Sequence, residues 1–323
     1  MDKDTWLVGI DVGGTSVKMA FISASGALIH KWEIATDRSN GGKNITKDIA
    51  DSLTAQLQLL GADHNRVAGV GIGAPGFIDM DRGFIHEAVN IGWKNYPLKE
   101  EMEKATGWPV FVDNDANIAA IGEMWKGAGD GADDVLCVTL GTGVGGGVIA
   151  GGNIVHGAGG MAGEIGHITV IPEGGFQCNC GRSGCLETVA SATGIRRLAL
   201  ADIDHYPHSK LTEIYKETGD LTAKHVLDAA RDLDSYAILV VEKVSHYLGL
   251  TLAGLAITLN PKKIVIGGGV SKAGDTLLKP LDHYLKQYTL PIVYKDLTLV
   301  TAILGNDAGI YGGAWLAKTH FAH

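Results

Sequence analysis

Basic side chains are in the minority in this chain of 323 residues, which carries 27 Lys and Arg against 36 Asp and Glu. The formal net charge of −9 leaves no surplus for the basic stripe that binds nucleic acid or an anionic membrane. We therefore expect no nucleic-acid partner. A nucleotide remains a candidate ligand, because backbone N–H groups can hold phosphates without net positive charge.

Long apolar runs are also scarce. The longest uncharged apolar stretch in the C-terminal half, Tyr247 to Leu259, is too short to span a bilayer and predicts a buried helix. The acidic start, Met1 to Thr5, runs directly into a strand-like segment without the apolar core of a signal peptide. We therefore expect a cytoplasmic protein without a membrane partner.

Cysteine is rare, with four residues in the chain, and three of them fall between positions 178 and 185. In the reducing cytosol such a cluster indicates metal binding before disulfides. Glycine, in contrast, is abundant at 46 residues, far above the usual share of about 7%. The glycines gather between apolar runs, for example at 141–152 and 267–269, which indicates tight turns or backbone close to a ligand.

A strand pair around a glycine-rich turn, followed by a third strand, occurs twice. The two sets are predicted at Trp6–Asp11, Val17–Ile22 and Ala27–Ile34, and at Val135–Leu140, Gly147–Ala150 and Ile154–Val155. Other strands are predicted at Val67–Gly73, Val110–Val112, Lys263–Ile266 and Leu297–Leu304, and helices at about 45–60, 97–107, 115–126, 275–288 and from 310. A long helix that ends at Asn260-Pro261 is predicted to be capped by Ser235. The repetition predicts a duplicated α/β domain.

Both glycine turns are suited to bind phosphate. The first runs from Asp11 to Lys18, and its glycines can turn tightly and offer N–H groups, while Asp11 can hold Mg²⁺ through water. The second runs from Leu140 to Gly147. Neither is a Walker P-loop or a good Rossmann fingerprint, because the Gly-Lys-Ser/Thr sequence is missing and a strand follows each turn. For either turn alone, a plain hairpin is the alternative.

Taken together, these turns resemble the phosphate hairpins of the actin-like ATPase fold, and further motifs make the resemblance specific. They are Asp11-Val-Gly-Gly-Thr, Gly73-Ala-Pro-Gly76, Asn90-Ile-Gly-Trp93, Asn114-Asp115-Ala-Asn117, Glu164-Ile-Gly-His167 and Cys178-Asn-Cys180-Gly-Arg-Ser-Gly-Cys185-Leu-Glu187. With these motifs the chain resembles, over essentially its whole length, the ROK family (repressors, open reading frames and kinases), and within it the bacterial glucose kinases.

The resemblance implies an α/β protein with the actin-like ATPase (ribonuclease H-like) fold, in which two duplicated α/β domains flank a cleft. The small N-terminal domain is expected at 1–117 plus about 305–323, and the large domain, with a zinc-binding loop, at 118–304. ATP and Mg²⁺ are the implied cofactors. The positions that match the family's nucleotide site are Asp11, Gly13, Gly14, Thr15, Lys18, Gly141, Thr142, Gly143, Gly267, Gly268 and Gly269.

Phosphoryl transfer to an alcohol needs a carboxylate that orients the hydroxyl and accepts its proton. Asp115 matches the family's catalytic aspartate and follows a strand at the start of a helix, where the helix dipole favours the ionised form. The alternative is that Asp113 or Asp115 only caps this helix. The positions that match the family's sugar site are Gly76, Asn90, Asn114, Asp115, Glu164, His167 and Glu187.

The resemblance also implies a structural zinc site made by His167, Cys178, Cys180 and Cys185. Four such ligands complete a tetrahedral shell and leave no open position for catalysis. The zinc would therefore fix the loop that carries Glu187 and the turn that carries Glu164, and His167 could offer its second ring nitrogen to a sugar hydroxyl. Three reduced, unliganded thiols are the alternative.

The implied function is ATP-dependent phosphorylation of the 6-hydroxyl of a hexose, with glucose as the first choice and glycolysis as the destination. Fructose, mannose, N-acetylglucosamine and N-acetylmannosamine remain alternative substrates, and a non-catalytic sugar-binding regulator remains an alternative function. A repressor is disfavoured, because the first phosphate turn begins at Asp11 and leaves no room for a DNA-binding domain. A homodimer is expected by analogy only.

Overall fold

The computed structural model describes residues 5–320, which divide into two compact units. Within the described residues, the first unit holds the chain up to Gly131, His156–Ala162 and the chain from Leu304, and the second holds Ala132–Val155 and Gly163–Ile303. The sequence placed the boundary near residue 117, whereas the first unit also includes the helix that follows. Residues 1–4 and 321–323 of the predicted first domain lie outside the described residues.

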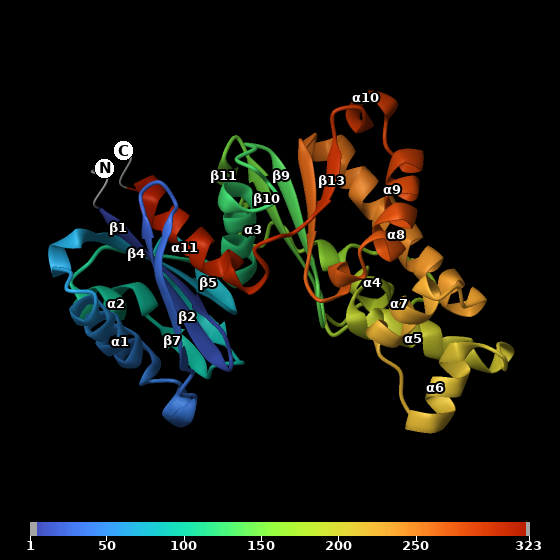
Figure 1. The fold of residues 1–323 in the computed structure, drawn as a ribbon, viewed down its shortest axis with the longest axis horizontal. Coiled ribbons are helices and arrows are strands. Elements are labelled where there is room, and N and C mark those ends of the chain that lie inside the picture. Colours follow the sequence, from blue (N-terminus) through green and yellow to red (C-terminus); the bar gives the residue numbers. More distant parts are fainter. Residues whose placement is uncertain (1–4, 321–323) are drawn as a thin grey trace. The chain divides into compact units, whose positions relative to one another are not determined.

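The first unit is built on a five-stranded sheet with the order β3-β2-β1-β4-β8 (Figure 1). Its strands are β1 (Trp6–Val12), β2 (Ser16–Ser23), β3 (Leu28–Ala35), β4 (Val67–Ala74) and β8 (Val110–Asn114). The strand β1 pairs antiparallel with β2 and parallel with β4, and β4 pairs parallel with β8. The carboxyl ends of β1, β4 and β8 therefore meet at one edge of the sheet, where Asp11 and Asn114 lie.

A second, three-stranded sheet of this unit was not predicted. It consists of β5 (Phe77–Asp79), β6 (Phe84–Ala88) and β7 (Trp93–Tyr96), which pair in that order. These strands have only three, five and four residues, so their hydrophobic alternation is too short to recognise in the sequence.

Helices cover both faces of the five-stranded sheet. They are α1 (Ile45–Leu59), α2 (Leu98–Thr106), α3 (Asp115–Lys126) and α11 (Ala308–His320). Side chains alternate along β1, so that Val8 and Ile10 pack in a core with α1 and α2, and Leu7 packs with α11.

Glycines let α11 approach its neighbours closely. A Cβ atom on Gly9 would lie 1.7 Å from the Ile310 carbonyl oxygen, and one on Gly312 would lie 1.7 Å from the carbonyl oxygen of Ile118 in α3. Figure 1 shows α11 and α3 side by side on one face of the sheet. This packing is why α3 belongs to the first unit.

The second unit repeats the sheet of the first, with the order β11-β10-β9-β12-β13. Its strands are β9 (Val135–Leu140), β10 (Val144–Ala150), β11 (Asn153–Ile154), β12 (Lys263–Gly267) and β13 (Thr298–Thr301). As β1 does in the first unit, the central strand β9 pairs antiparallel with the next strand, β10, and parallel with a later strand, β12. The predicted duplication of the α/β domain is confirmed.

The rest of the second unit is mainly helical, as predicted for the chain after residue 190. The helices are α4 (Glu187–Ala190), α5 (Ala192–Ala201), α6 (Lys210–Thr218), α7 (Ala223–Arg231), α8 (Ser235–Leu259), α9 (Asp275–Tyr288) and α10 (Pro291–Tyr294). The predicted cap of α8 was wrong by one residue. The N-cap is Asp234, whose carboxylate accepts a hydrogen bond from the backbone N–H of Ala237, and Ser235 is the first helical residue.

Among the described residues, one helix, α8, is long and apolar enough to cross a membrane by length and composition, and 50% of that apolar window is buried. Its inner side chains, including Val240 and Leu248, belong to the core of the second unit. The core helix of a folded domain passes the same test. The predicted burial was wrong for Leu250 and Ile257, which are 43% and 44% exposed.

Candidate functional site

Asp115 lies at the start of α3, directly after β8. The N-cap of this helix is Asn114, whose side-chain oxygen accepts a hydrogen bond of 2.9 Å from the backbone N–H of Ala116. The Asp115 carboxylate accepts from the same N–H at 2.8 Å, and Asp115 is exposed. An ionised carboxylate is favoured at this end of a helix. Asn114, and neither Asp113 nor Asp115, is therefore the N-cap of this helix. The exposed carboxylate of Asp115 is accessible to a ligand.

The first glycine turn brings Asp11 near Asp115. Asp11 ends β1 opposite Lys18 of β2, and the turn between them is closed by a hydrogen bond of 3.0 Å from Gly13 N to Ser16 O. Burial raises the pKa of Asp11 to about 6; Lys18 opposes this shift, and the nearby Asp115 carboxylate adds to it. Two carboxylates at the edge of one sheet, one of them costly to ionise, are typical of a site that binds a cation or moves a proton.

Asn90 lies beside this turn. It belongs to the segment between β6 and β7, and a Cβ atom on Gly14 would lie 3.8 Å from the Asn90 Cβ atom. Gly76, in the segment between β4 and β5, has a positive φ of 101°, and a Cβ atom there would lie 2.1 Å from the Glu87 carbonyl oxygen. Only glycine fits at that position. The structure thus places Asn90 next to the first glycine turn and gives Gly76 a conformational role, whatever ligand it contacts.

Three predicted nucleotide residues of the second unit, Gly141, Gly143 and Gly268, line one open hollow of about 350 Å³. The other lining residues are Thr139, Val144, Gly145 and Glu187. Gly268 has a φ of 83°, and a Cβ atom there would lie 2.4 Å from the Leu140 carbonyl oxygen, so the third glycine loop (267–269) packs directly against the second. The carbonyl oxygen of Gly141 accepts a hydrogen bond of 2.8 Å from Ala192 N, which fixes the second loop to the start of α5. Thr139 was missed by sequence reasoning, because a threonine inside a strand carries no motif.

Glu187 lies against the second glycine loop. Its Oε2 atom accepts a hydrogen bond of 3.0 Å from Val144 N, and a Cβ atom on Gly143 would lie 2.5 Å from the same oxygen. The N–H group of Val144 is thus bound by a carboxylate of this chain. The sequence predicted Glu187 as a sugar ligand, and the structure adds that it borders the predicted phosphate loop.

The three clustered cysteines and His167 converge. Their ligand atoms all lie within 4.8 Å of one another, with 3.6 Å between Cys178 Sγ and His167 Nδ1 and 3.6 Å between Cys180 Sγ and Cys185 Sγ. Ligands about 2.3 Å from a tetrahedral zinc ion lie roughly 3.7 Å apart, so the geometry fits a Cys₃His site.

The pKa values of two thiols in this cluster are shifted in opposite directions. A backbone hydrogen bond from Arg182 lowers the pKa of the Cys180 thiol to about 6, and burial raises the pKa of the Cys185 thiol to about 12. The Arg182 guanidinium also donates a hydrogen bond of 2.7 Å to the His167 carbonyl oxygen. A bound cation would favour the thiolate form of both cysteines. Sequence reasoning had not assigned Arg182 any role.

His167 connects this cluster to Glu164. Its Nδ1 atom faces Cys178, and its Nε2 atom lies 3.8 Å from Glu164 Oε2. Glu164 is exposed and precedes the short 3₁₀ helix that contains His167, Ile165–His167. One ring nitrogen therefore faces the candidate metal ligands, and the other faces the candidate sugar ligand Glu164.

The sequence analysis assigned no role to His156, which pairs with a buried carboxylate in the structure. His156 Nε2 lies 2.8 Å from Asp113 Oδ2, and Asp113 is the residue two positions before Asp115. The pairing spans 43 residues, and no motif or spacing in the sequence reveals it.

Comparison with known proteins identifies close relatives over the whole length. The profile of the ROK family matches residues 7–320. A glucokinase from Halalkalibacterium halodurans is 58% identical over 98% of this chain and 96% of its own length.

Solved structures agree with this match. A ROK hexokinase from Thermus thermophilus is 31% identical, with a TM-score of 0.81, and covers 98% of this chain and 99% of its own. A ROK family glucokinase from Streptomyces griseus, in complex with glucose and AMPPNP, is 35% identical, with a TM-score of 0.73, and covers 97% and 99%. The predicted actin-like α/β fold is confirmed.

Proposed function

The chain belongs to the ROK family, and we propose that it transfers the γ-phosphoryl group of ATP to the 6-hydroxyl of glucose. The observation that carries this proposal is the exposed carboxylate of Asp115, held at a helix N-terminus near Asp11 and the first glycine turn. The identity of 58% to a glucokinase supports glucose as the acceptor. The product, glucose 6-phosphate, would enter glycolysis in the cytoplasm.

Asp115 acts as the general base. Its carboxylate orients the 6-hydroxyl and accepts the proton as the oxygen attacks phosphorus, which leaves positioning and charge stabilisation to the rest of the site. The N-terminus of α3 carries partial positive charge, which favours the ionised form of a carboxylate at this position.

The glycine turns hold the nucleotide. Residues 13–15 and Lys18 of the first unit, and residues 141–143 and 267–269 of the second, offer backbone N–H groups and one ammonium to the phosphates. Asp11 would hold Mg²⁺ through water, and the cation would offset the charge of the β- and γ-phosphates.

The residues that we propose to bind the sugar are Gly76, Asn90 and Asn114 in the first unit and Glu164, His167 and Glu187 in the second. Carboxylates and amides suit a ligand with several hydroxyls. Zinc held by His167 and the three clustered cysteines would supply structure and no reaction chemistry. These four residues include the predicted sugar ligand His167 and lie close in sequence to the other two of the second unit, Glu164 and Glu187.

A panel of hexoses with ATP tests the acceptor. We expect kcat/KM for glucose to exceed the values for fructose, mannose, N-acetylglucosamine and N-acetylmannosamine by at least about tenfold, because an unpaired buried polar group penalises the wrong sugar. The measurement is ADP release in a coupled assay. A better substrate among the other four would replace glucose, and no ADP with any sugar would favour a non-catalytic regulator.

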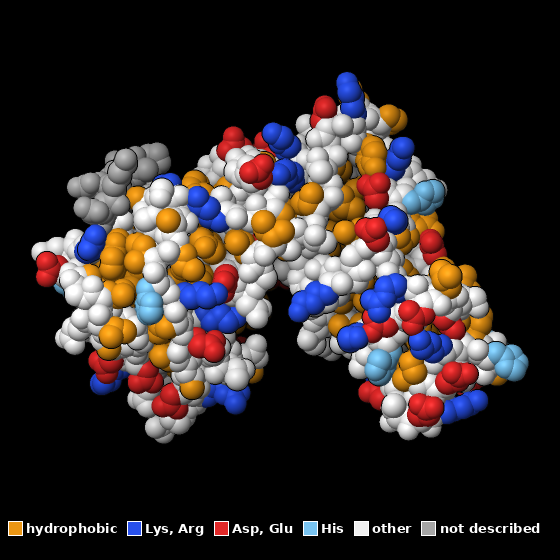
Figure 2. Space-filling model, in the orientation of Figure 1, with side chains coloured by type: hydrophobic (Ala, Val, Ile, Leu, Met, Phe, Trp, Pro, Cys, Tyr) orange, Lys and Arg blue, Asp and Glu red, His pale blue; other side chains and the backbone are white. Residues whose placement is uncertain are grey.

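We expect no nucleic-acid partner, and this proposal rests on surface charge. The net charge is −9, and Figure 2 shows acidic and basic side chains intermixed on the face in view instead of a basic stripe.

A homodimer is supported by the outer face of α8. Its exposed residues Leu239, Lys243, Leu250, Gly254 and Ile257 recur at intervals of three, four or seven, the spacing of a helix-packing seam. In an antiparallel two-fold pairing of two such helices, Leu239 would face Ile257 of the partner, and Lys243 would lie close to its Gly254, which leaves room for the long side chain.

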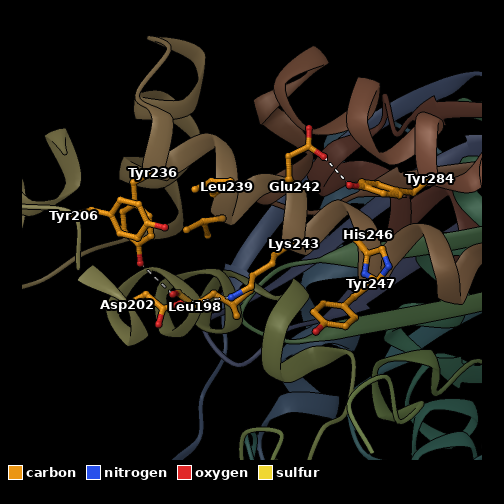
Figure 3. A pocket seen from close by; sticks show the side chains of 11 residues that line it. Leu198, Asp202, Tyr206, Tyr236, Leu239, Glu242, Lys243, His246, Tyr247 and Tyr284 are labelled. Atoms are coloured by element: carbon orange, nitrogen blue, oxygen red, sulfur yellow. Dashed lines mark hydrogen bonds and ion pairs between the residues drawn. The ribbon is translucent and has the colours of Figure 1, made fainter. Parts of the chain in front are cut away.

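The same side of α8 borders a hollow of about 380 Å³, formed with α5 and α9. Figure 3 shows the paired rings of Tyr206 and Tyr236 at one end and the hydrogen bond of 3.0 Å from the Tyr284 hydroxyl to Glu242 at the other. Leu239 and Lys243 belong both to the exposed face of α8 and to the lining of this hollow. Its other lining residues include several tyrosines, and aromatic residues are enriched at protein interfaces.

Sedimentation velocity tests the dimer. We expect wild-type protein to sediment with about twice the chain mass of 33.9 kDa and Leu250→Asp to sediment as a monomer, because an unpaired carboxylate would be buried at the seam. Leu59→Asp, at a residue of α1 that is 72% exposed, is the matched control and should stay dimeric. Wild-type protein that sediments as a monomer would contradict the dimer proposal.

A further inference from the structure

We propose that His156 is a positioning residue for phosphoryl transfer, which holds the catalytic carboxylate of Asp115 in place by binding the buried carboxylate of Asp113. The inference rests on the proposed function of Asp115. It assigns a role in the reaction to a histidine and an aspartate outside the matched family motifs.

Asp113 is the centre of this arrangement. Its side chain is 1% exposed, and it uses both oxygens: Oδ1 accepts from Asn117 Nδ2 at 2.8 Å and from Asn114 N at 2.7 Å, and Oδ2 faces His156 Nε2 at 2.8 Å. Removing one partner from such a buried carboxylate is costly, because its charge has little access to water. The carboxylate will therefore move or recruit another partner if His156 is lost.

The partners of Asp113 flank Asp115 on both sides. Asn114 precedes Asp115 and caps α3, and Asn117 lies buried within the first turn of the same helix. A shift of Asp113 would thus be passed to the backbone on both sides of the proposed base. Displacements near 1 Å are enough to lower a transfer rate substantially, because attack requires a defined approach of the hydroxyl.

His156 comes from a part of the chain that is suited to this role. It begins the segment His156–Ala162, which packs with the first unit although the residues on both sides belong to the second. The segment closes on itself through a hydrogen bond of 3.0 Å from Ala162 N to His156 O, and Glu164 follows two residues later. His156 therefore also anchors the segment that leads to a predicted sugar ligand.

Electrostatics agree with the geometry. The hydrogen bond to Asp113 raises the pKa of His156, partial burial opposes the shift, and the charges of Asp113 and Asp81 add to it. The histidine is held by an acceptor that favours its charged form, and it offsets the charge of a buried carboxylate whose other partners, Asn114 and Asn117, are neutral.

Steady-state kinetics of His156→Ala and His156→Gln test the inference. We expect His156→Ala to lower kcat with glucose by roughly ten- to a hundredfold and to leave KM for ATP within about twofold, because the side-chain hydrogen bonds described for His156 and Asp113 do not involve the predicted nucleotide residues. We expect His156→Gln, which keeps an N–H donor, to recover most of the lost kcat. If the alanine variant does not fold, His156→Asn gives the same test, because the shorter asparagine side chain cannot reach the carboxylate of Asp113.

The control is Glu123→Gln, which perturbs another buried carboxylate of α3, 5% exposed and bonded to Leu304 N at 2.8 Å, far along the helix from Asp115. Its kcat should stay near wild type. Unchanged kcat in His156→Ala, no recovery in His156→Gln, or an equal loss in Glu123→Gln would each overturn the positioning role. Wild-type protein without glucose phosphorylation would instead show that the proposed function had failed.

Discussion

Asp115→Asn is expected to lower kcat with glucose by about 10²–10⁴, with a much smaller change in glucose binding. Asparagine keeps the size and the hydrogen-bonding capacity of the side chain but cannot accept the proton of the 6-hydroxyl. The backbone N–H of Ala116, to which Asp115 Oδ1 is bonded at 2.8 Å, can be bonded equally by an amide oxygen, so the first turn of α3 should persist. The measurement is kcat in a coupled ADP assay, together with a glucose titration of the protein's tryptophan fluorescence.

The matched control for this variant is Asp51→Asn. Asp51 is an exposed carboxylate on α1 that pairs with Lys47, and its loss should leave kcat unchanged. Near-normal kcat in Asp115→Asn would refute the assignment of the base. A loss of glucose binding as large as the loss of kcat would make Asp115 a ligand of the sugar without a role as base.

Cys180→Ser is expected to reduce bound zinc from one ion per chain and to raise KM for glucose by about tenfold or more, while KM for ATP changes little. Serine cannot supply the thiolate that completes the tetrahedral shell. The predicted sugar ligands Glu164 and His167 follow the geometry of this cluster, since His167 faces Cys178 through one ring nitrogen and Glu164 through the other. The measurements are elemental analysis and steady-state kinetics on freshly purified protein.

Cys137→Ala is the control, because Cys137 is a buried cysteine of β9 that does not belong to the cluster of potential metal ligands. This variant should keep its zinc and its affinity for glucose. Active wild-type protein without zinc would contradict the structural role of the metal, and so would a Cys180→Ser variant that loses zinc but keeps its KM for glucose.

Local patterns were sufficient to predict most of the fold. The two hairpins around glycine turns, at β1–β2 and β9–β10, are each formed by residues adjacent in sequence, and alternating apolar residues mark their strands. The boundaries were less accurate, since Asp234 and not Ser235 caps α8, and β5 to β7 are too short to show a period. Burial on α8 was overestimated, because an apolar sequence does not show which face of a helix its neighbours leave open.

Only the parts of the site that belong to sequence motifs could be predicted. The convergence of His167 with Cys178, Cys180 and Cys185 followed from spacing and family resemblance. The pairing of His156 with Asp113 could not be predicted, because it depends on a segment that leaves one unit and packs in the other. The same applies to the hydrogen bond from Val144 N to Glu187, which joins a strand to a distant helix. Contacts of this kind arise from tertiary packing and have no local signature.

The central claim is that this chain moves a phosphoryl group from ATP to one hydroxyl of glucose. Phosphorus and carbon NMR of a reaction with ¹³C-labelled glucose, ATP and Mg²⁺ tests it most directly, because the phosphorus–carbon coupling identifies the carbon that bears the new ester. We predict glucose 6-phosphate and ADP in equal amounts as the products. Phosphate on another hydroxyl, or ADP with free phosphate and unmodified glucose, would contradict the account.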